Sequence, residues 1–204
     1  VDQLANLRDF QWQGKIHSKL VEGPDGAMYF TTDGGESREE YLMEHPHGYN
    51  GSYFFRWDPA TRTLRNLGAG LQFESIKDLE VDQTDGSILA VSYPQVHLLH
   101  YNPARNLFRD LGRVGSDHVP RVMFKDWWNN IYYVDWRQRL IQYEHSTGRL
   151  NFARDSLPMF PGTTGNQIVT GVTAYATDRA HGIIYLNTYG SQDLAFHPQL
   201  TGIA

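Results

Sequence analysis

Short runs of apolar and β-branched residues are separated along this chain by Gly, Pro, Asp and Asn. Two examples are Ile88-Leu-Ala-Val-Ser92 and Ile131-Tyr-Tyr-Val-Asp135. Such runs have the length and composition of β-strands, and the residues between them favour turns. The pattern predicts an all-β fold.

One hairpin pattern recurs along the chain. An aromatic residue, an Asp-Pro or Asn-Pro turn and a short strand make up Trp57-Asp-Pro-Ala-Thr-Arg-Thr-Leu-Arg-Asn-Leu-Gly68 and Tyr101-Asn-Pro-Ala-Arg-Asn-Leu-Phe-Arg-Asp-Leu-Gly112. Weaker copies begin at Tyr143 and Phe196. Each copy predicts two antiparallel strands joined by a tight turn.

A second hairpin precedes each copy of the first. Its turns hold Asp25-Gly26, Asp85-Gly86, Asn129-Asn130 and His181-Gly182, and Asp-Gly and Asn-Asn are pairs that tolerate positive φ. Four strands in roughly 40 to 55 residues match the size of one β-propeller blade. The sequence therefore predicts a β-propeller with about four four-stranded blades.

The repeat also predicts boundaries. We expect blades at residues 14–68, 69–112, 113–154 and 155–204, with residues 6–10 as a displaced outer strand. Either that strand completes the last blade of a closed four-bladed ring, or the chain is part of a six- to eight-bladed propeller with uncovered blade edges.

Composition and charge exclude several classes of partner and chemistry. The chain has 27 aromatic residues beside 19 Gly and 9 Pro, and its net charge is −5. A mildly acidic protein lacks the broad basic surface that nucleic acid requires. Cysteine is absent, which excludes disulfides and thiolate chemistry, and no apolar run is long enough to span a bilayer. We expect no nucleic-acid partner and no transmembrane segment.

A family resemblance rests on two of these stretches. Gly14-Lys-Ile-His-Ser-Lys-Leu-Val-Glu-Gly-Pro-Asp-Gly-Ala-Met-Tyr-Phe30 and the hairpin from Trp57 to Gly68 resemble bacterial propellers of a broad group. The group includes gluconolactonase-like proteins, virginiamycin B lyase, and ulvan and oligogalacturonate lyases. The resemblance implies a propeller fold and a periplasmic or extracellular location.

The longest predicted loop carries a candidate metal site. Residues 33–52 form a loop of about 20 residues, a length that is often functional in a compact domain. His45, His47 and Asp33 within it are residue types that bind divalent ions such as Ca, Zn or Mn. Solvent-exposed histidines with no ligand are the alternative interpretation.

A second hypothesis is a polysaccharide lyase. β-Elimination needs a base, a proton donor and a cation beside the substrate carboxylate. His17 or His47 is the candidate base or charge neutraliser, Tyr93 the proton donor and Arg121 the carboxylate clamp. Ulvan lyases use residues of these three types, although their motif does not match this chain residue by residue.

Strand ends of successive repeats point to the same channel mouth. Asp33, Tyr93, Trp136 and Tyr189 end the same strand of each unit, and aromatic rings there suit stacking on sugars. Lys77 begins an inner strand nearby. We assign substrate binding to Lys77, Trp136 and Tyr189; packing between blades is the other interpretation of the aromatic rings.

These observations favour a carbohydrate-active propeller that binds or cleaves an acidic, uronate-containing polysaccharide by β-elimination. The first alternative is a non-catalytic propeller subunit that binds a protein partner, with Trp127 and Trp128 as an anchor or through uncovered blade edges. The second is a metal-dependent lactonase-like hydrolase.

Overall fold

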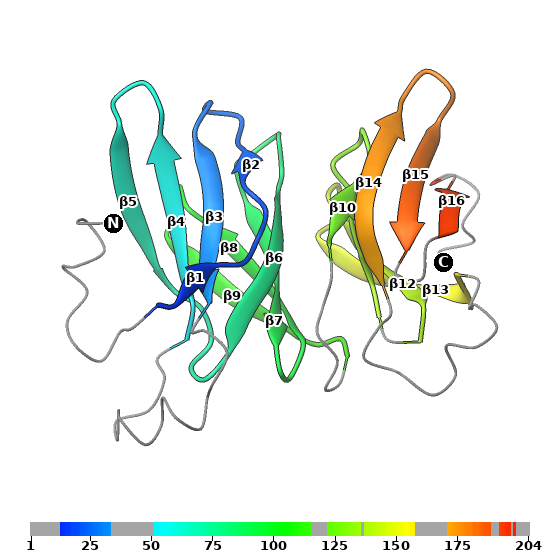
Figure 1. Ribbon diagram of the computed structural model, residues 1–204, viewed down its shortest axis with the longest axis horizontal. Helices are drawn as coiled ribbons and strands as arrows, with labels where there is room; N and C mark the ends of the chain where they lie inside the picture. The colour runs from blue at the N-terminus through cyan, green and yellow to red at the C-terminus, as the bar shows by residue number, and fades with distance from the viewer. Residues whose placement is uncertain are drawn as a thin grey trace.

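The computed structural model describes residues 13–33, 51–115, 122–135, 137–157, 171–188, 192–196 and Pro198. Strands and turns make up nearly all of them (Figure 1). No helix in these ranges is long and apolar enough to cross a membrane. The strands form four antiparallel sheets arranged as a four-bladed β-propeller, as the repeat predicts.

Each sheet follows the order of its strands along the chain, apart from a divided innermost strand in the first. The first contains β1 (Lys15–Ile16), β2 (Val21–Glu22), β3 (Met28–Asp33), β4 (Tyr53–Asp58) and β5 (Thr63–Ala69). The second contains β6 (Ser75–Val81), β7 (Ile88–Tyr93), β8 (His97–Asn102) and β9 (Leu107–Arg113). The third contains β10 (Phe124–Lys125), β11 (Ile131–Val134), β12 (Arg139–Glu144) and β13 (Arg149–Ser156). The fourth contains β14 (Val172–Asp178), β15 (Ile183–Thr188) and β16 (Gln192–Phe196).

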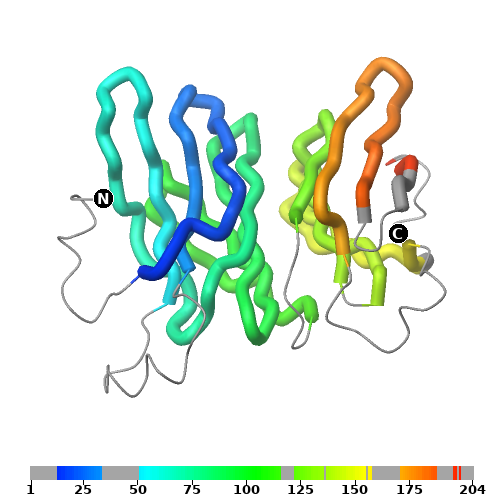
Figure 2. Tube along the Cα trace, in the orientation of Figure 1, coloured from blue at the N-terminus to red at the C-terminus, as the bar shows by residue number. Residues whose placement is uncertain are grey.

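The sheets follow one another in sequence order in space. In the chain trace, the first and second sheets lie on one side and the third and fourth on the other (Figure 2). β5, β9 and β13 end one or two residues beyond the predicted blade limits. The predicted displaced strand at residues 6–10 lies outside the described residues.

The turns of the first hairpin of each blade have the predicted backbone conformation. Gly26, Gly86, Asn129 and Gly182 have φ values of 72°, 73°, 64° and 69°. Positive φ is favourable for Gly and tolerated by Asn, which explains why these residue types recur there. Local turn chemistry therefore sets the hairpin positions.

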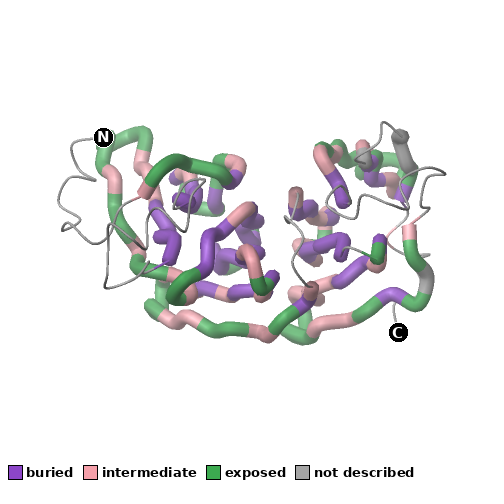
Figure 3. The backbone as a smooth tube through the Cα atoms, turned by 60° about the horizontal axis from the view of Figure 1, so that its bottom comes forward, coloured by how far each residue is buried: buried purple, intermediate pink, exposed green. Residues whose placement is uncertain are grey.

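The hydrophobic core lies between neighbouring sheets. Phe54 of the first sheet stacks on Tyr101 of the second at 5.5 Å between ring centroids. Phe124 of the third sheet contacts Phe196 of the fourth edge to face at 5.8 Å. The buried segments accordingly lie inside the molecule and many exposed segments on its outer turns (Figure 3).

The innermost strands of the first, second and fourth sheets are irregular. The pairing of β6 with β7 shifts register between Ile76 and Asp78, so Lys77 is a bulge residue. The pairing of β14 with β15 shifts between Val172 and Ala174, which places Thr173 in a bulge. In the first sheet, residues 17–20 separate β1 from β2, so the innermost strand is interrupted. Bulges re-aim side chains, and here they turn polar groups toward the centre.

Candidate functional site

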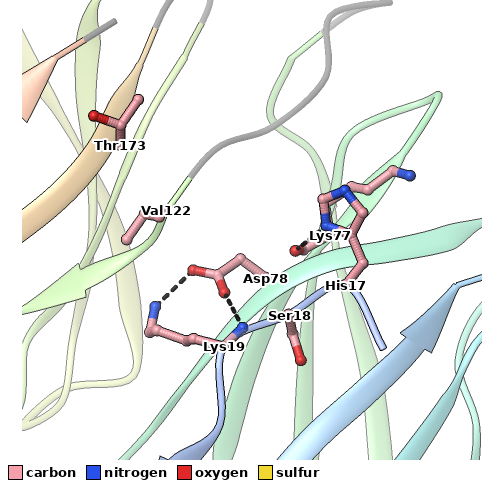
Figure 4. Close-up of a pocket in the computed structure, with 7 residues that line it drawn as sticks. All are labelled: His17, Ser18, Lys19, Lys77, Asp78, Val122 and Thr173. Carbon is pink, nitrogen blue, oxygen red and sulfur yellow. Dashed lines mark hydrogen bonds and ion pairs between the residues drawn. The ribbon is translucent and has the colours of Figure 1, made fainter. Parts of the chain in front are cut away.

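A cavity of about 370 Å³ lies where the four blades converge. Segments from every blade line it, with residues His17, Ser18, Lys19, Lys77, Asp78, Val122 and Thr173 (Figure 4). Cavities of about 300 Å³ or more accommodate small organic ligands. The bulges therefore surround a space large enough for a sugar unit.

His17 contributes an available base to this cavity. It is exposed in the segment between β1 and β2, and its Nδ1 lies 3.1 Å from the main-chain oxygen of Lys77 (Figure 4). A carbonyl oxygen only accepts hydrogen bonds, so Nδ1 must carry the proton. The neutral ring then keeps its lone pair on Nε2, where it can accept a proton.

Lys77 also lines the cavity, and its ammonium group pairs with a carboxylate. Its Nζ forms an ion pair with the fully buried Asp33 and lies 5.2 Å from the ring centroid of Tyr93. The Lys77 side chain is 10% exposed and lines the cavity. Asp33 occupies one N–H of a group that has three.

Lys19 reaches across the channel from its own blade to two others. Its Nζ is 2.6 Å from Asp78 Oδ2, 2.7 Å from the main-chain oxygen of Met123 and 3.0 Å from Glu80 Oε1. These acceptors match the three N–H groups of an ammonium. Lys19 is therefore saturated and holds the cavity wall, whereas the Lys77 ammonium pairs with one carboxylate, Asp33.

Asp78 is equally engaged. It accepts hydrogen bonds from the main-chain N–H of Lys19 (3.1 Å) and of Met123 (2.8 Å) as well as from the Lys19 ammonium. One carboxylate thus connects the first, second and third blades. Its role in the site is structural.

The fourth blade joins this network through Tyr175. The Tyr175 hydroxyl donates to Glu80 Oε1 at 2.7 Å, and Lys125 lies 3.6 Å from Glu80 Oε2. Burial, followed by the charge of Glu80, raises the pKa of Tyr175 far above its ordinary value. Tyr175 therefore remains a neutral hydrogen-bond donor to Glu80.

Four of the predicted site residues lie together. His17, Lys77, Asp33 and Tyr93 are linked by the contacts above although up to 76 positions separate them in the chain. The other candidates lie outside the described residues and stay predictions: His45, His47, Arg121, Trp136 and Tyr189.

The sequence analysis missed the polar network around Lys19. Asp78 and Glu80 alternate with Leu79 and Val81 in β6, a pattern that places two carboxylates on the same strand face. Acidic residues repeated on one face of an inner strand were the available signal. No sequence signal identifies Thr173 as a cavity residue, because the position of its side chain depends on the bulge.

The structure describes only one of the three residues of the candidate metal site, Asp33. Among the described residues, no three His, Cys, Asp or Glu side chains are grouped as metal ligands. Asp33 already faces the Lys77 ammonium, whose positive charge opposes a divalent ion at the same carboxylate oxygen. Since His45 and His47 are not described, a metal site at this loop stays a prediction.

Comparisons by sequence yield no relative. No family model matches the chain, and no curated protein matches it.

Comparisons by structure yield β-propellers. A gluconolactonase from Xanthomonas campestris matches with a TM-score of 0.58 and 15% identity, over 93% of this chain and 60% of its own. A streptogramin B lyase matches with a TM-score of 0.54 and 11% identity, over 95% and 59%. The extracellular domain of a putative one-component system from B. thetaiotaomicron matches with a TM-score of 0.54 and 15% identity, over 86% and 21%.

The chain spans no more than about 60% of the length of these proteins. At such low identity, the likeness concerns the fold. The chain is a β-propeller, similar in fold to bacterial lyase and gluconolactonase propellers.

Proposed function

We propose that the protein binds an acidic polysaccharide at the central cavity and cleaves it by β-elimination, with His17 as the base. One observation carries the proposal: the bond from His17 Nδ1 to the Lys77 carbonyl leaves Nε2 as an acceptor at a cavity that Lys77 also lines. A base beside a cation is the pairing that proton abstraction next to a carboxylate requires.

The reaction breaks two bonds and forms one double bond. His17 Nε2 removes the proton from the sugar carbon that carries the carboxylate. The electron pair forms a carbon–carbon double bond as the neighbouring carbon–oxygen bond to the next sugar breaks. A proton donor then neutralises the leaving oxygen, so the elimination needs no oxidant or reductant.

Lys77 and Tyr93 are assigned the remaining roles. The Lys77 ammonium pairs with the substrate carboxylate and stabilises the negative charge that develops there. Tyr93, whose ring faces Lys77 at 5.2 Å, protonates the leaving oxygen. His47 as an alternative base and Arg121 as a carboxylate clamp remain parts of the hypothesis, and a periplasmic or extracellular location fits such a substrate.

The test uses His17→Gln, because glutamine keeps a hydrogen-bonding side chain but cannot accept the proton. We expect the wild-type protein to generate unsaturated products from a panel of uronate polysaccharides, followed by ultraviolet absorbance. His17→Gln should lower kcat at least about a hundredfold. His181→Gln, which changes an exposed histidine on a turn of the fourth blade, should retain full activity.

Tyr93→Phe and Lys77→Met separate the other two roles. Loss of the hydroxyl should lower kcat, whereas loss of the ammonium should also raise KM for uronates. Absence of unsaturated product from the wild-type protein across the panel would reject the lyase function.

A protein-docking function is the second candidate, and the Trp127–Trp128 pair favours it. The two rings lie 4.9 Å apart and Trp128 is 44% exposed. A solved propeller described as bound to a D1 peptide shares this fold with a TM-score of 0.55 and 8% identity, over 90% of this chain and 51% of its own. Under this hypothesis Trp128→Ala abolishes binding of a protein partner while His17→Gln leaves that binding unchanged.

A further inference from the structure

Two outer hairpins carry exposed arginines on the side of the blades remote from the channel. They precede or lie within β5 and β9, the outermost strands of the first and second blades. We call them the outer arginines: Arg62, Arg65, Arg105 and Arg109.

None of these four side chains forms an ion pair or hydrogen bond within the part of the chain that the structure describes. Nearby carboxylates have other partners. Asp58 accepts the main-chain N–H groups of Ala60 and Thr61, and Asp110 pairs with His97 at 2.9 Å. The positive charge of the outer arginines is therefore not neutralised locally.

The strand register places two like charges opposite each other, which destabilises the sheet. Arg65 lies directly opposite Arg56 in the β4–β5 pairing, and like charges in that position destabilise a sheet. Arg56 is balanced by Asp25, 2.8 Å away, which leaves Arg65 without a carboxylate of its own.

The second blade repeats the arrangement. Arg109 occupies the position equivalent to Arg65 and lies opposite His100. Burial lowers the pKa of His100; the charge of Asp85 acts in the opposite direction, and the positive charge of Arg109 lowers the pKa. Two successive blades thus place an unpaired arginine where the sheet itself gains nothing from it.

Arg62 lies at a turn position with positive φ, which favours other residue types. Its φ is 55°, and the equivalent turn positions of the next two blades hold Asn106 and Gly148, with φ of 47° and 66°. Asn and Gly adopt this conformation readily, whereas a long side chain does so at a cost. Local structure therefore does not account for an arginine at this turn.

The repeated arginines lie near successive gaps between blades. The charge of Arg65 acts on Tyr101 of the second blade, and that of Arg109 acts on Tyr143 of the third. Arg65 and Arg109 thus place a positive charge at the same position of two consecutive blades. A polymer with a negative charge on each repeating unit is complementary to charges repeated in this way.

We infer that the outer arginines form a second binding surface, outside the channel, for an anionic polysaccharide. Guanidinium groups pair well with carboxylates and remain charged at all physiological pH values. The inference rests on the proposed function only for the choice of polymer. It assigns long-chain binding to a surface that takes no part in catalysis.

Charged residues on outer strands also prevent edge-to-edge aggregation of sheets. That role requires charge of any kind and no ligand. It predicts that removing two arginines changes solubility or self-association and leaves polymer binding unchanged, which would overturn the inference.

The experiment measures binding of the full chain to immobilised polygalacturonate over a series of NaCl concentrations. Arg65→Gln with Arg109→Gln should weaken binding about tenfold at low salt, because each exposed pair contributes a modest free energy. The slope of log affinity against log salt should become shallower by about 0.7 for each arginine removed, as for a flexible polyanion.

Matched variants make the result specific. Arg179→Gln removes an exposed arginine from the β14–β15 turn and should leave binding unchanged, in contrast to Arg65→Gln alone. Equal losses in the two single variants would show a general charge effect and overturn the inference. Equally tight, equally arginine-dependent binding of single-stranded DNA would overturn the assignment to a polysaccharide.

His17→Gln separates this surface from the proposed catalytic site. That variant should bind the long polymer as the wild type does, whereas the double arginine variant should keep full turnover of a short galacturonate oligomer. If the wild-type protein has no lyase activity but the arginine variants still lose polymer binding, the second surface stands and the proposed function fails.

Discussion

His100 is a half-buried side chain between the second and third blades, with its ring centroid 5.8 Å from that of Tyr143. Its Nδ1 is buried and has no hydrogen-bond partner in the described residues. Burial therefore lowers its pKa. His17 differs in each respect: it is exposed, and its Nδ1 donates to a carbonyl. The same residue type is thus suited to packing at one position and to proton transfer at the other.

The lowered pKa of His100 predicts a pH-dependent stability. The unfolded chain binds the proton at higher pH than the folded chain, so stability is lost as pH falls from about 6.5 through the lower folded value. His100→Phe removes this titration and fits the aromatic contact with Tyr143. We expect the drop in Tm between about pH 7 and pH 5 to be smaller in His100→Phe than in the wild type.

His181→Phe is the control for that measurement. His181 pairs with Asp178 on an exposed turn, and its side chain is 74% exposed. An equal reduction of the pH effect in this variant would show that His100 is not its source.

At the scale of the element, the start of β4 depends on a close backbone approach. Gly51, two residues before β4, has a φ of 93°, and a Cβ atom there would overlap the Leu71 carbonyl oxygen. Ser52 accepts the N–H of Ile76 on its hydroxyl, which links this strand start to β6 of the next blade. The entry to one strand and the innermost strand of its neighbour are thus fitted together.

We expect Gly51→Ala to be much more destabilising than Gly26→Ala. Each glycine has positive φ, which costs an L-residue about 1 kcal/mol, but Gly26 has open space where a Cβ would lie. The backbone overlap at Gly51 should raise the loss in unfolding free energy to roughly 3 kcal/mol. Urea denaturation of the two variants measures the difference, and similar losses would show that φ alone matters.

At the scale of the whole molecule, one lysine connects the blades. Lys19 of the first blade contacts Asp78 and Glu80 of the second and the Met123 carbonyl of the third, and its ammonium lies 5.9 Å from the Tyr175 ring of the fourth. The network joins the blades at the channel, whereas apolar contacts join them farther out.

Lys19→Met should lower the unfolding free energy by about 2 kcal/mol, because it leaves the buried Asp78 without an ammonium partner and Glu80 with only the more distant Lys125. Lys125→Met is the matched control. Lys125 makes one hydrogen bond, to the Val81 carbonyl, and is 3.6 Å from Glu80, so its loss should cost less. Denaturation of both variants measures the two losses in unfolding free energy. A larger loss for Lys125→Met would contradict the network described for Lys19.

Most of the fold is predictable from the sequence, because local features define it. The Asp-Gly and Asn-Asn turns and the aromatic strand ends identify each hairpin without knowledge of its neighbours. The innermost strands are less predictable from the sequence. The break over residues 17–20 and the bulge at Lys77 have no turn residue or composition change to mark them.

For the site, the repeat predicts proximity but not pairing. Asp33 and Tyr93 end equivalent strands of successive blades, and the sequence analysis placed them at one mouth with Lys77 nearby. It assigned substrate binding to Lys77, a positively charged residue. In the structure the buried Asp33 balances that charge, and Lys19 is occupied by three acceptors.

The sequence alone determined the blade repeat, the hairpin turns and the candidate residues at the channel mouth, since turn chemistry and strand composition act over a few neighbouring residues. Tertiary structure decided which partners the charged side chains have. Lys19 and Lys77 look alike in the sequence, but in the structure Lys19 contacts three acceptors from two other blades, whereas Lys77 pairs with one buried carboxylate. Pairing of this kind depends on distances between blades, and those distances are set only when all the blades pack together.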